Sequence, residues 1–109
     1  PDAVRAAEAE RLLRRLPADA DLVALTREGR AWDSRGLATY LEEGALHARD
    51  RAFVIGGAFG LGEAVLARAS WRWSLSALTF PHEVARLVLV EQLYRAGTIL
   101  RGEPYHKGS

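Results

Sequence analysis

The chain contains no cysteine among its 109 residues. This absence excludes a disulfide framework, a thiolate zinc site and a cysteine nucleophile. Lysine is nearly absent as well, because Lys107 is the only lysine among 15 basic residues and the rest are arginines. The arginine bias fits either phosphate binding or the codon usage of a GC-rich genome. The histidines His47, His82 and His106 lack the short spacings of metal ligands, so we expect no metal site.

Long apolar runs and a strong net charge are also missing. No segment approaches the roughly 18 uninterrupted apolar residues of a membrane helix, so we expect no membrane partner. The net charge of +1 creates no global basic field that would indicate tight binding to naked nucleic acid. A hydrophobic content of 49% excludes a disordered tail, and the length favours one domain spanning residues 1–109.

Apolar periodicity and turn residues divide the chain into alternating helices and strands. Gly29 is expected in the turn after the first strand, and Asp33 or Ser34 is expected to cap the second helix. Such alternation predicts a three-layer α/β fold. The expected helices cover residues 2–16, 34–45, 63–69 and 82–100, and the expected strands cover residues 21–26, 51–55 and 75–79.

The last expected helix, residues 82–100, is apolar around most of its circumference. A helix of this kind must be buried on more than one side. In a chain this short, a second subunit is the cover that we expect.

A glycine-rich turn, residues 56–62, follows the second expected strand and precedes a helix. Glycines allow close approach of the backbone, and a helix N-terminus offers free N–H groups. The spacing fits neither G-x-G-x-x-G nor a P-loop, so no nucleotide motif is present. A tight structural turn and a small-molecule cradle both remain open.

Two further segments have both a structural and a functional interpretation. Trp71 and Trp73, on either side of Arg72, are expected to pack in the core or to stack on RNA. His82 either begins a helix or takes part in a site. The tail at residues 104–107 (PYHK) either frays in solvent or grips RNA through its aromatic, imidazole and ammonium groups.

These pieces together resemble the RlmH family, small bacterial methyltransferases of the SPOUT superfamily. The resemblance rests on FVIGGAFGLG at residues 53–62 and on SLSALTFPHEVARLVLVEQLYRAGTILRGEPYHK at residues 74–107. LVALTREGRAWDSRGLATYL at residues 22–41 is similar to the middle of the family pattern. The resemblance implies a SPOUT-type three-layer α/β/α sheet with a C-terminal trefoil knot. It also implies a cytoplasmic homodimer whose active site is completed across subunits.

The implied activity is transfer of a methyl group from S-adenosyl-L-methionine to N3 of a pseudouridine in helix 69 of 23S ribosomal RNA, in the assembled ribosome. By resemblance, His106 is the general base, Tyr105 helps to hold it, and Arg95 binds phosphate or stabilises the developing imide anion. Lys107 would contact RNA phosphate. The implied cofactor-binding residues are Leu25, Gly57, Ser76, Ala77, Leu78, Thr79, Phe80 and Pro81.

The sequence departs from the family pattern at two places. Glu83 follows His82 where relatives commonly have proline, and an acidic residue is favourable near a helix N-terminus. Relatives are about half as long again and begin with a strand, a helix and a further strand that precede the matching part, so we interpret the chain as the later part of the family fold. An alternative function is therefore a cofactor-binding or ribosome-binding fragment without methyl transfer.

Overall fold

The structure, a computed structural model, describes residues 2–56 and 61–107. Four helices and three strands alternate along the chain, as the sequence predicts. Their order is α1 (Asp2–Arg15), β1 (Asp21–Ala31), α2 (Ser34–Leu46), β2 (Arg51–Ile55), α3 (Glu63–Arg68), β3 (Trp71–Ser74) and α4 (His82–Leu100).

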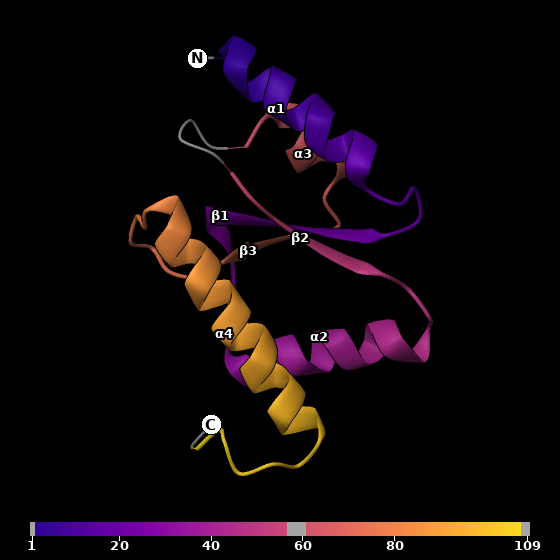
Figure 1. The fold of residues 1–109 in the computed structure, drawn as a ribbon, viewed down its shortest axis with the longest axis vertical. Helices are drawn as coiled ribbons and strands as arrows, with labels where there is room; N and C mark the ends of the chain where they lie inside the picture. The colour runs from indigo at the N-terminus through magenta and orange to yellow at the C-terminus, as the bar shows by residue number, and fades with distance from the viewer. Residues whose placement is uncertain (1, 57–60, 108–109) are drawn as a thin grey trace.

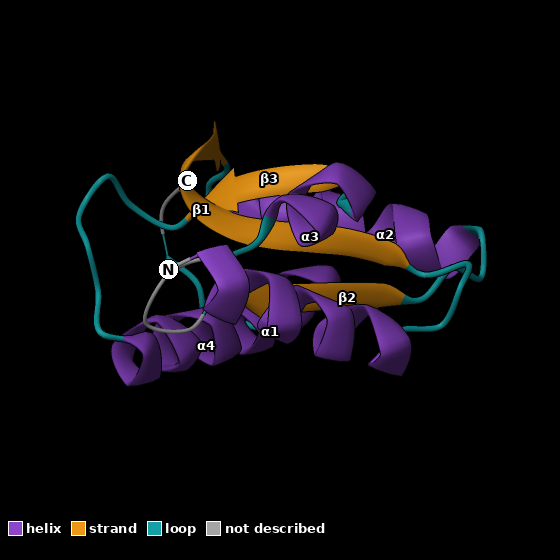
Figure 2. Ribbon diagram, turned by 90° about the horizontal axis from the view of Figure 1, so that it is seen from above, coloured by secondary structure: helices purple, strands orange, loops and turns teal. Residues whose placement is uncertain are grey.

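The three strands form a parallel sheet in the order β2-β1-β3. Figure 1 shows α1 and α3 on one face of the sheet and α2 and α4 on the other, and Figure 2 shows the same elements from above. The described residues therefore form three layers, α/β/α, which confirms the predicted α/β layering. β1 is the central strand of the sheet. Helix α2 connects β1 to β2 on one face, and α3 connects β2 to β3 on the other face (Figure 1).

Alternation along the strands divides the core into two halves, because successive side chains point to opposite faces of a sheet. Leu22 and Ala24 of β1 pack under α1 and α3, together with Val54 of β2. Val23 and Phe53, one residue along, pack under α2 and α4. Strands buried on both faces explain why β1 and β2 begin as nearly continuous apolar runs.

The third strand was placed wrongly by the sequence pattern. β3 covers Trp71–Ser74, whereas residues 75–79 form a loop. Serine hydroxyls account for the difference: Ser74 Oγ donates to the carbonyl oxygen of Ser76 at 3.0 Å, and the backbone N–H of Leu78 donates to Ser76 Oγ at 3.0 Å. Such local bonds compete with a strand ladder. Trp73 lies in the core and is 3% exposed, which confirms the packing interpretation for this residue.

Gly29 also differs from its prediction, because it lies inside β1 rather than in a turn. The pairing of β1 with β3 shifts register between Leu25 and Arg30. An added Cβ at Gly29 would lie 2.6 Å from the backbone carbonyl carbon of Arg72. Glycine is therefore needed for close approach of two backbones.

An ion-pair cluster joins the first two strands at the edge of the sheet where they begin. Asp21 accepts hydrogen bonds from Arg49 Nη2 at 2.6 Å and from Arg51 Nη1. The Arg51 guanidinium also stacks on the ring of Tyr40, 3.9 Å from its centroid, and donates to the carbonyl oxygen of that residue at 3.0 Å. Burial lowers the pKa of Arg51 from its ordinary value.

Helix α4 has the predicted bounds and only part of its apolar surface is covered within the chain. Leu89 and Ala96 are buried against the rest of the fold. Leu87 is 68% exposed, Val90 54% and Tyr94 55%. The described part of the chain contains no helix with the length and apolarity required to cross a membrane.

Candidate functional site

A cavity of about 750 Å³ lies at the carboxyl ends of β2 and β3, beside the middle of β1, which continues past it to Ala31. Its floor includes Leu25 and Thr26 of β1 and Ile55 at the end of β2. Its wall is the segment from Leu75 to His82, between β3 and α4. Ligands of open α/β sheets bind beyond the carboxyl ends of the strands, so the cavity lies where this architecture places a site. Its volume is in the range of small-molecule pockets.

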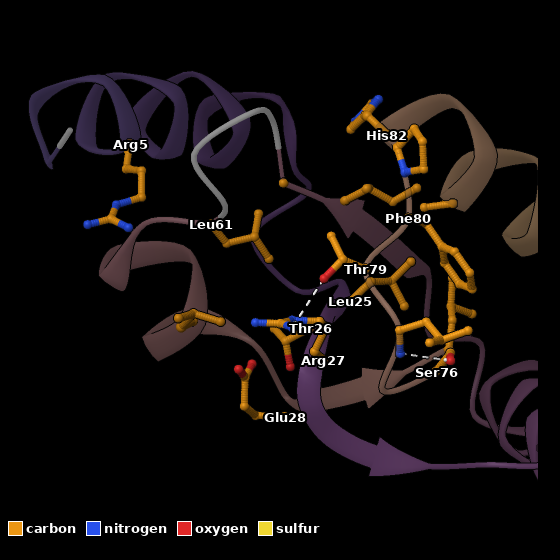
Figure 3. A pocket seen from close by; sticks show the side chains of 17 residues that line it. Arg5, Leu25, Thr26, Arg27, Glu28, Leu61, Ser76, Thr79, Phe80 and His82 are labelled. Carbon is orange, nitrogen blue, oxygen red and sulfur yellow. Dashed lines mark hydrogen bonds between the residues drawn. The ribbon is translucent and has the colours of Figure 1, made fainter.

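The wall of the cavity is a loop held by its own hydroxyl groups. Two bonds described above, from Ser74 to Ser76 and from Leu78 to Ser76, turn the backbone away from a strand path. A third bond fastens the loop to β1, because Arg27 Nη1 donates to Thr79 Oγ1 at 3.1 Å (Figure 3). Three hydrogen bonds to hydroxyl groups therefore hold the shape of the loop.

The cavity lining mixes apolar and charged groups. Arg5, Arg27 and Glu28 contribute charge, and Phe80 and Leu66 contribute apolar surface. The hydroxyl of Thr26 is buried and has no hydrogen-bond partner among the described residues. A buried hydroxyl without a partner is costly unless a ligand or water satisfies it.

The structure brings most of the predicted cofactor residues together. Leu25 lines the cavity, and so do five residues of the loop. Ala77 lies in the same loop, where it is exposed, but it is not part of the cavity lining. Gly57 lies outside the described residues. The five loop residues in the lining are Ser76, Leu78, Thr79, Phe80 and Pro81.

The predicted catalytic residues form a second cluster, at the C-terminal end of α4. Arg95 Nη2 donates to Glu91 Oε2 at 2.8 Å, and the hydroxyl of Tyr105 donates to the same oxygen at 2.9 Å. The Arg95 guanidinium lies over the ring of Tyr105, 4.8 Å from its centroid. The ring of Tyr105 packs edge-on against Tyr94 at 5.0 Å. Tyr105 therefore acts on the cluster through Glu91 and Arg95.

Hydrogen bonds shift the pKa values of two groups in this cluster. The bond from Arg95 is the largest reason why the pKa of Glu91 lies below its ordinary value. The bond to Glu91 raises the pKa of Tyr105, so its hydroxyl remains a donor. Glu91 is thus held as a carboxylate between a guanidinium and a phenol.

His106 is oriented by Arg95. The distance from Arg95 Nη1 to His106 Nδ1 is 3.2 Å. A guanidinium only donates, so Nδ1 must be the acceptor and the neutral ring carries its proton on Nε2. Nε2 is buried without a partner among the described residues. In this arrangement His106 can accept a proton at Nδ1 only after Arg95 moves away. Lys107 is exposed beyond it, at the end of the described tail.

The two clusters lie far apart within one chain. His82, the first residue of α4, borders the cavity, and Arg95 is on the same helix near its other end. At about 1.5 Å per residue, they are separated by about 20 Å along the helix axis. Figure 1 shows the tail at the opposite end of α4 from the loop that precedes the helix. One chain therefore does not bring the predicted base to the predicted cofactor pocket.

Two groups in these clusters were not predicted from the sequence. Glu91 connects Arg95 to Tyr105, and its spacing of four residues from Arg95 on a helix is a recognisable sign of a pair. Arg27 and its bond to Thr79 follow from β1 continuing past Leu25, which the expected turn at Gly29 concealed.

Comparison with known proteins identifies the family of the chain. The family model described as "Predicted SPOUT methyltransferase" matches residues 1–106. The ribosomal RNA large subunit methyltransferase H of Gemmatimonas aurantiaca is 61% identical over 106 residues, covering 97% of this chain and 69% of that protein. The protein of the same name from Rubrobacter xylanophilus is 59% identical over 102 residues, covering 91% of this chain and 65% of that protein.

A more distant relative matches in the same way. The ribosomal RNA large subunit methyltransferase H of Bacillus pumilus is 48% identical over 101 residues, covering 92% of this chain and 64% of that protein. The chain thus spans about two thirds of the length of these relatives. On a match that takes in almost all of its residues, the chain belongs to the RlmH family of SPOUT methyltransferases.

Proposed function

We propose that the protein is a methyltransferase that uses S-adenosyl-L-methionine to methylate large-subunit ribosomal RNA at N3 of a pseudouridine in helix 69. The observation that carries the proposal is the cavity at the carboxyl ends of β2 and β3, walled by the segment at residues 75–82. The names of the related proteins support the RNA substrate. The pseudouridine and its position follow from the family resemblance alone.

The cavity has properties that suit the cofactor. Leu25 and Phe80 give the cavity apolar surface that suits a flat base. Arg5, Arg27 and Glu28 give it charge that suits the polar end of the cofactor. The Thr26 hydroxyl, buried without a partner among the described residues, offers a hydrogen bond that a polar ligand would satisfy. When bound there, S-adenosylmethionine supplies a methyl group on a positively charged sulfur.

We assign the chemistry on the RNA to the second cluster, at the C-terminal end of α4, which we call the tail cluster. A protonated imide nitrogen is a poor nucleophile, so the N3 proton must leave, and histidine is suited to accept it near neutral pH. Arg95 Nη1 lies 3.2 Å from Nδ1 of His106 and donates to it. We infer that an RNA phosphate or the developing imide anion attracts Arg95, which frees Nδ1 to take the N3 proton. Lys107 then contributes a phosphate contact.

The active site is completed by a second copy of the chain. The tail cluster and the cavity are about 20 Å apart on one helix, so a site that uses both needs the tail of a partner. The exposed apolar face of α4, with Leu87 68% exposed and Val90 54%, offers a surface for that contact. A homodimer, a trefoil-knotted C-terminal half and a cytoplasmic location complete the proposal, the last two on family grounds.

Two measurements test the function. Calorimetric titration with S-adenosylmethionine tests the pocket, and transfer of labelled methyl groups to ribosomes lacking the modification tests the reaction. His106→Ala should abolish methyl transfer and leave cofactor affinity unchanged, because the proposed role of the ring is to take the N3 proton and not to hold the cofactor. His47→Ala is the matched control, since that ring caps α2 and bonds only locally, to Glu43 O at 2.9 Å.

The outcomes separate the proposed enzyme from a binding protein. Full methylation by His106→Ala with cofactor still bound would refute the base assignment. Cofactor binding without methyl transfer to any ribosomal substrate would favour a binding fragment. A folded protein that binds no cofactor would refute the assignment of the cavity.

A further inference from the structure

The charged side of the cavity has an arrangement that the proposed function does not by itself require. Arg27 and Glu28 are consecutive residues of β1 with side chains of opposite charge, and both line the cavity. Figure 3 shows the two side chains on the same side of β1, beside the loop that carries Thr79. Both side chains are exposed, so both are accessible to a bound molecule.

The partners of these two side chains leave capacity for a ligand. Arg27 gives one donor to Thr79 Oγ1 at 3.1 Å, out of the five N–H donors that a guanidinium carries. No carboxylate of the described residues forms an ion pair with Arg27, and no cation of those residues forms one with Glu28. A cation and an anion side by side match the α-carboxylate and α-ammonium of an amino acid.

Resting on the proposed function, we propose that Arg27 and Glu28 bind the amino-acid end of S-adenosylmethionine. Arg27 takes the carboxylate and Glu28 takes the ammonium. A guanidinium offers parallel donors to a carboxylate, which gives both strength and direction. The bond from Arg27 to Thr79 then couples recognition of the amino-acid end to the loop that walls the cavity.

Two ligands, one with the amino-acid end and one without it, test the assignment of Arg27 and Glu28 separately from the assignment of the cavity. S-Adenosylhomocysteine carries the amino-acid end, whereas 5′-methylthioadenosine has the same nucleoside and sulfur without it. Affinities for both are measured by calorimetry on the unaltered protein and on Arg27→Gln. Loss of a charged hydrogen-bonding partner is worth about tenfold or more in affinity. We therefore expect Arg27→Gln to weaken S-adenosylhomocysteine about tenfold or more and to change methylthioadenosine less than about twofold.

Companion variants locate the effect. Glu28→Gln should weaken S-adenosylhomocysteine selectively, by a smaller factor, because an amide still accepts a hydrogen bond. Arg11→Gln, on the exposed surface of α1 and outside the cavity lining, is the charge-matched control and should change neither affinity. Arg5→Gln tests the other arginine of the lining and should leave the ratio of the two affinities unchanged.

Thr79→Val tests whether Arg27 acts only by holding the loop. It cuts the link between Arg27 and the loop and keeps the guanidinium, so the ratio of the two affinities should stay at its original value. If Thr79→Val lowers that ratio as much as Arg27→Gln does, Arg27 works through the loop and the inference is wrong.

Other results would also overturn the inference. Arg27→Gln could weaken both ligands equally or neither, or Arg5→Gln could produce the selective loss instead. If the unaltered, folded protein binds neither ligand, the assignment of the cavity fails and this inference fails with it. If it binds both and Arg27→Gln shows no selectivity, only the inference fails.

Discussion

Two inactive variants of the protein should restore each other when they share a dimer. Leu78→Arg puts a long cation into the cavity from a residue that is 69% exposed, so the core is left intact. His106→Ala removes the proposed base at the other end of α4. Each variant alone should transfer no methyl group. The mixed dimer, co-expressed with two different tags and purified through both, should regain activity.

The size of the recovery follows from the geometry. The cavity border at His82 and the cluster at Arg95 are about 20 Å apart along one rigid helix, so each site takes its cavity from one chain and its tail from the other. In a twofold dimer, one site of the mixed species then carries both defects and the other carries neither. The mixed dimer should show about half the activity of the unaltered dimer.

A second pairing gives the opposite expectation and acts as the control. The control dimer pairs an unaltered chain with a chain that carries both Leu78→Arg and His106→Ala. Each of its two sites then contains one altered residue, so both sites should be inactive. Its activity should be near zero. Activity is followed as labelled methyl transfer to ribosomes, with loss of cofactor binding by Leu78→Arg checked first by titration. Sites contained within one chain would reverse both results, and that reversal would refute the reasoning.

Three further predictions concern the framework around the site. Gly29→Ala should lower the free energy of unfolding by about 1–3 kcal/mol in urea titration, because its Cβ would lie 2.6 Å from backbone of the neighbouring strand. Gly97→Ala is the helical control and should be neutral or stabilising by up to about 1 kcal/mol, since its Cβ meets only the end of a flexible side chain. Asp21→Asn should cost about 2–4 kcal/mol by the same titration, because it leaves two guanidiniums, one of them largely buried, without their shared carboxylate. The bond from Arg95 lowers the pKa of Glu91 in the folded protein, so its stabilising effect is present above the unfolded pKa and is lost as pH falls through the lowered value. Thermal unfolding should therefore show a smaller acid destabilisation for Glu91→Gln than for the unaltered protein, and equal pH profiles would contradict the assignment.

Sequence patterns were sufficient for much of the fold. The helix His82–Leu100 and the strand Arg51–Ile55 have the predicted bounds, and Asp33 caps α2 by accepting a bond from the backbone of Gly36 at 2.7 Å. These elements are bounded by strong local signals: proline before a helix, a capping carboxylate, and a short apolar run buried on both faces. Local chemistry and tertiary burial agree at these positions, so either one leads to the correct structure.

The third strand shows where such agreement ends. Residues 75–79 have the apolar content of a strand, whereas Trp71–Ser74 contains an arginine and a serine. Pairing with β1 depends on a register that only the folded sheet defines, with Leu25 beside Trp73. Two serine hydroxyls then hold the next segment out of the sheet. Composition alone does not show which of two adjacent segments pairs with β1.

The same disagreement marks the site. Had residues 75–79 continued the sheet as a strand, their side chains would alternate between the two faces and would not form a wall beside β1 and the end of β2. As a loop, the segment closes one side of the cavity and places Thr79 within reach of Arg27. Functional sites are where local preference and final structure tend to conflict. The serines that keep residues 75–79 out of the sheet therefore also shape the pocket. Ser76→Ala should loosen the loop and lower the free energy of cofactor binding by more than it lowers the free energy of unfolding.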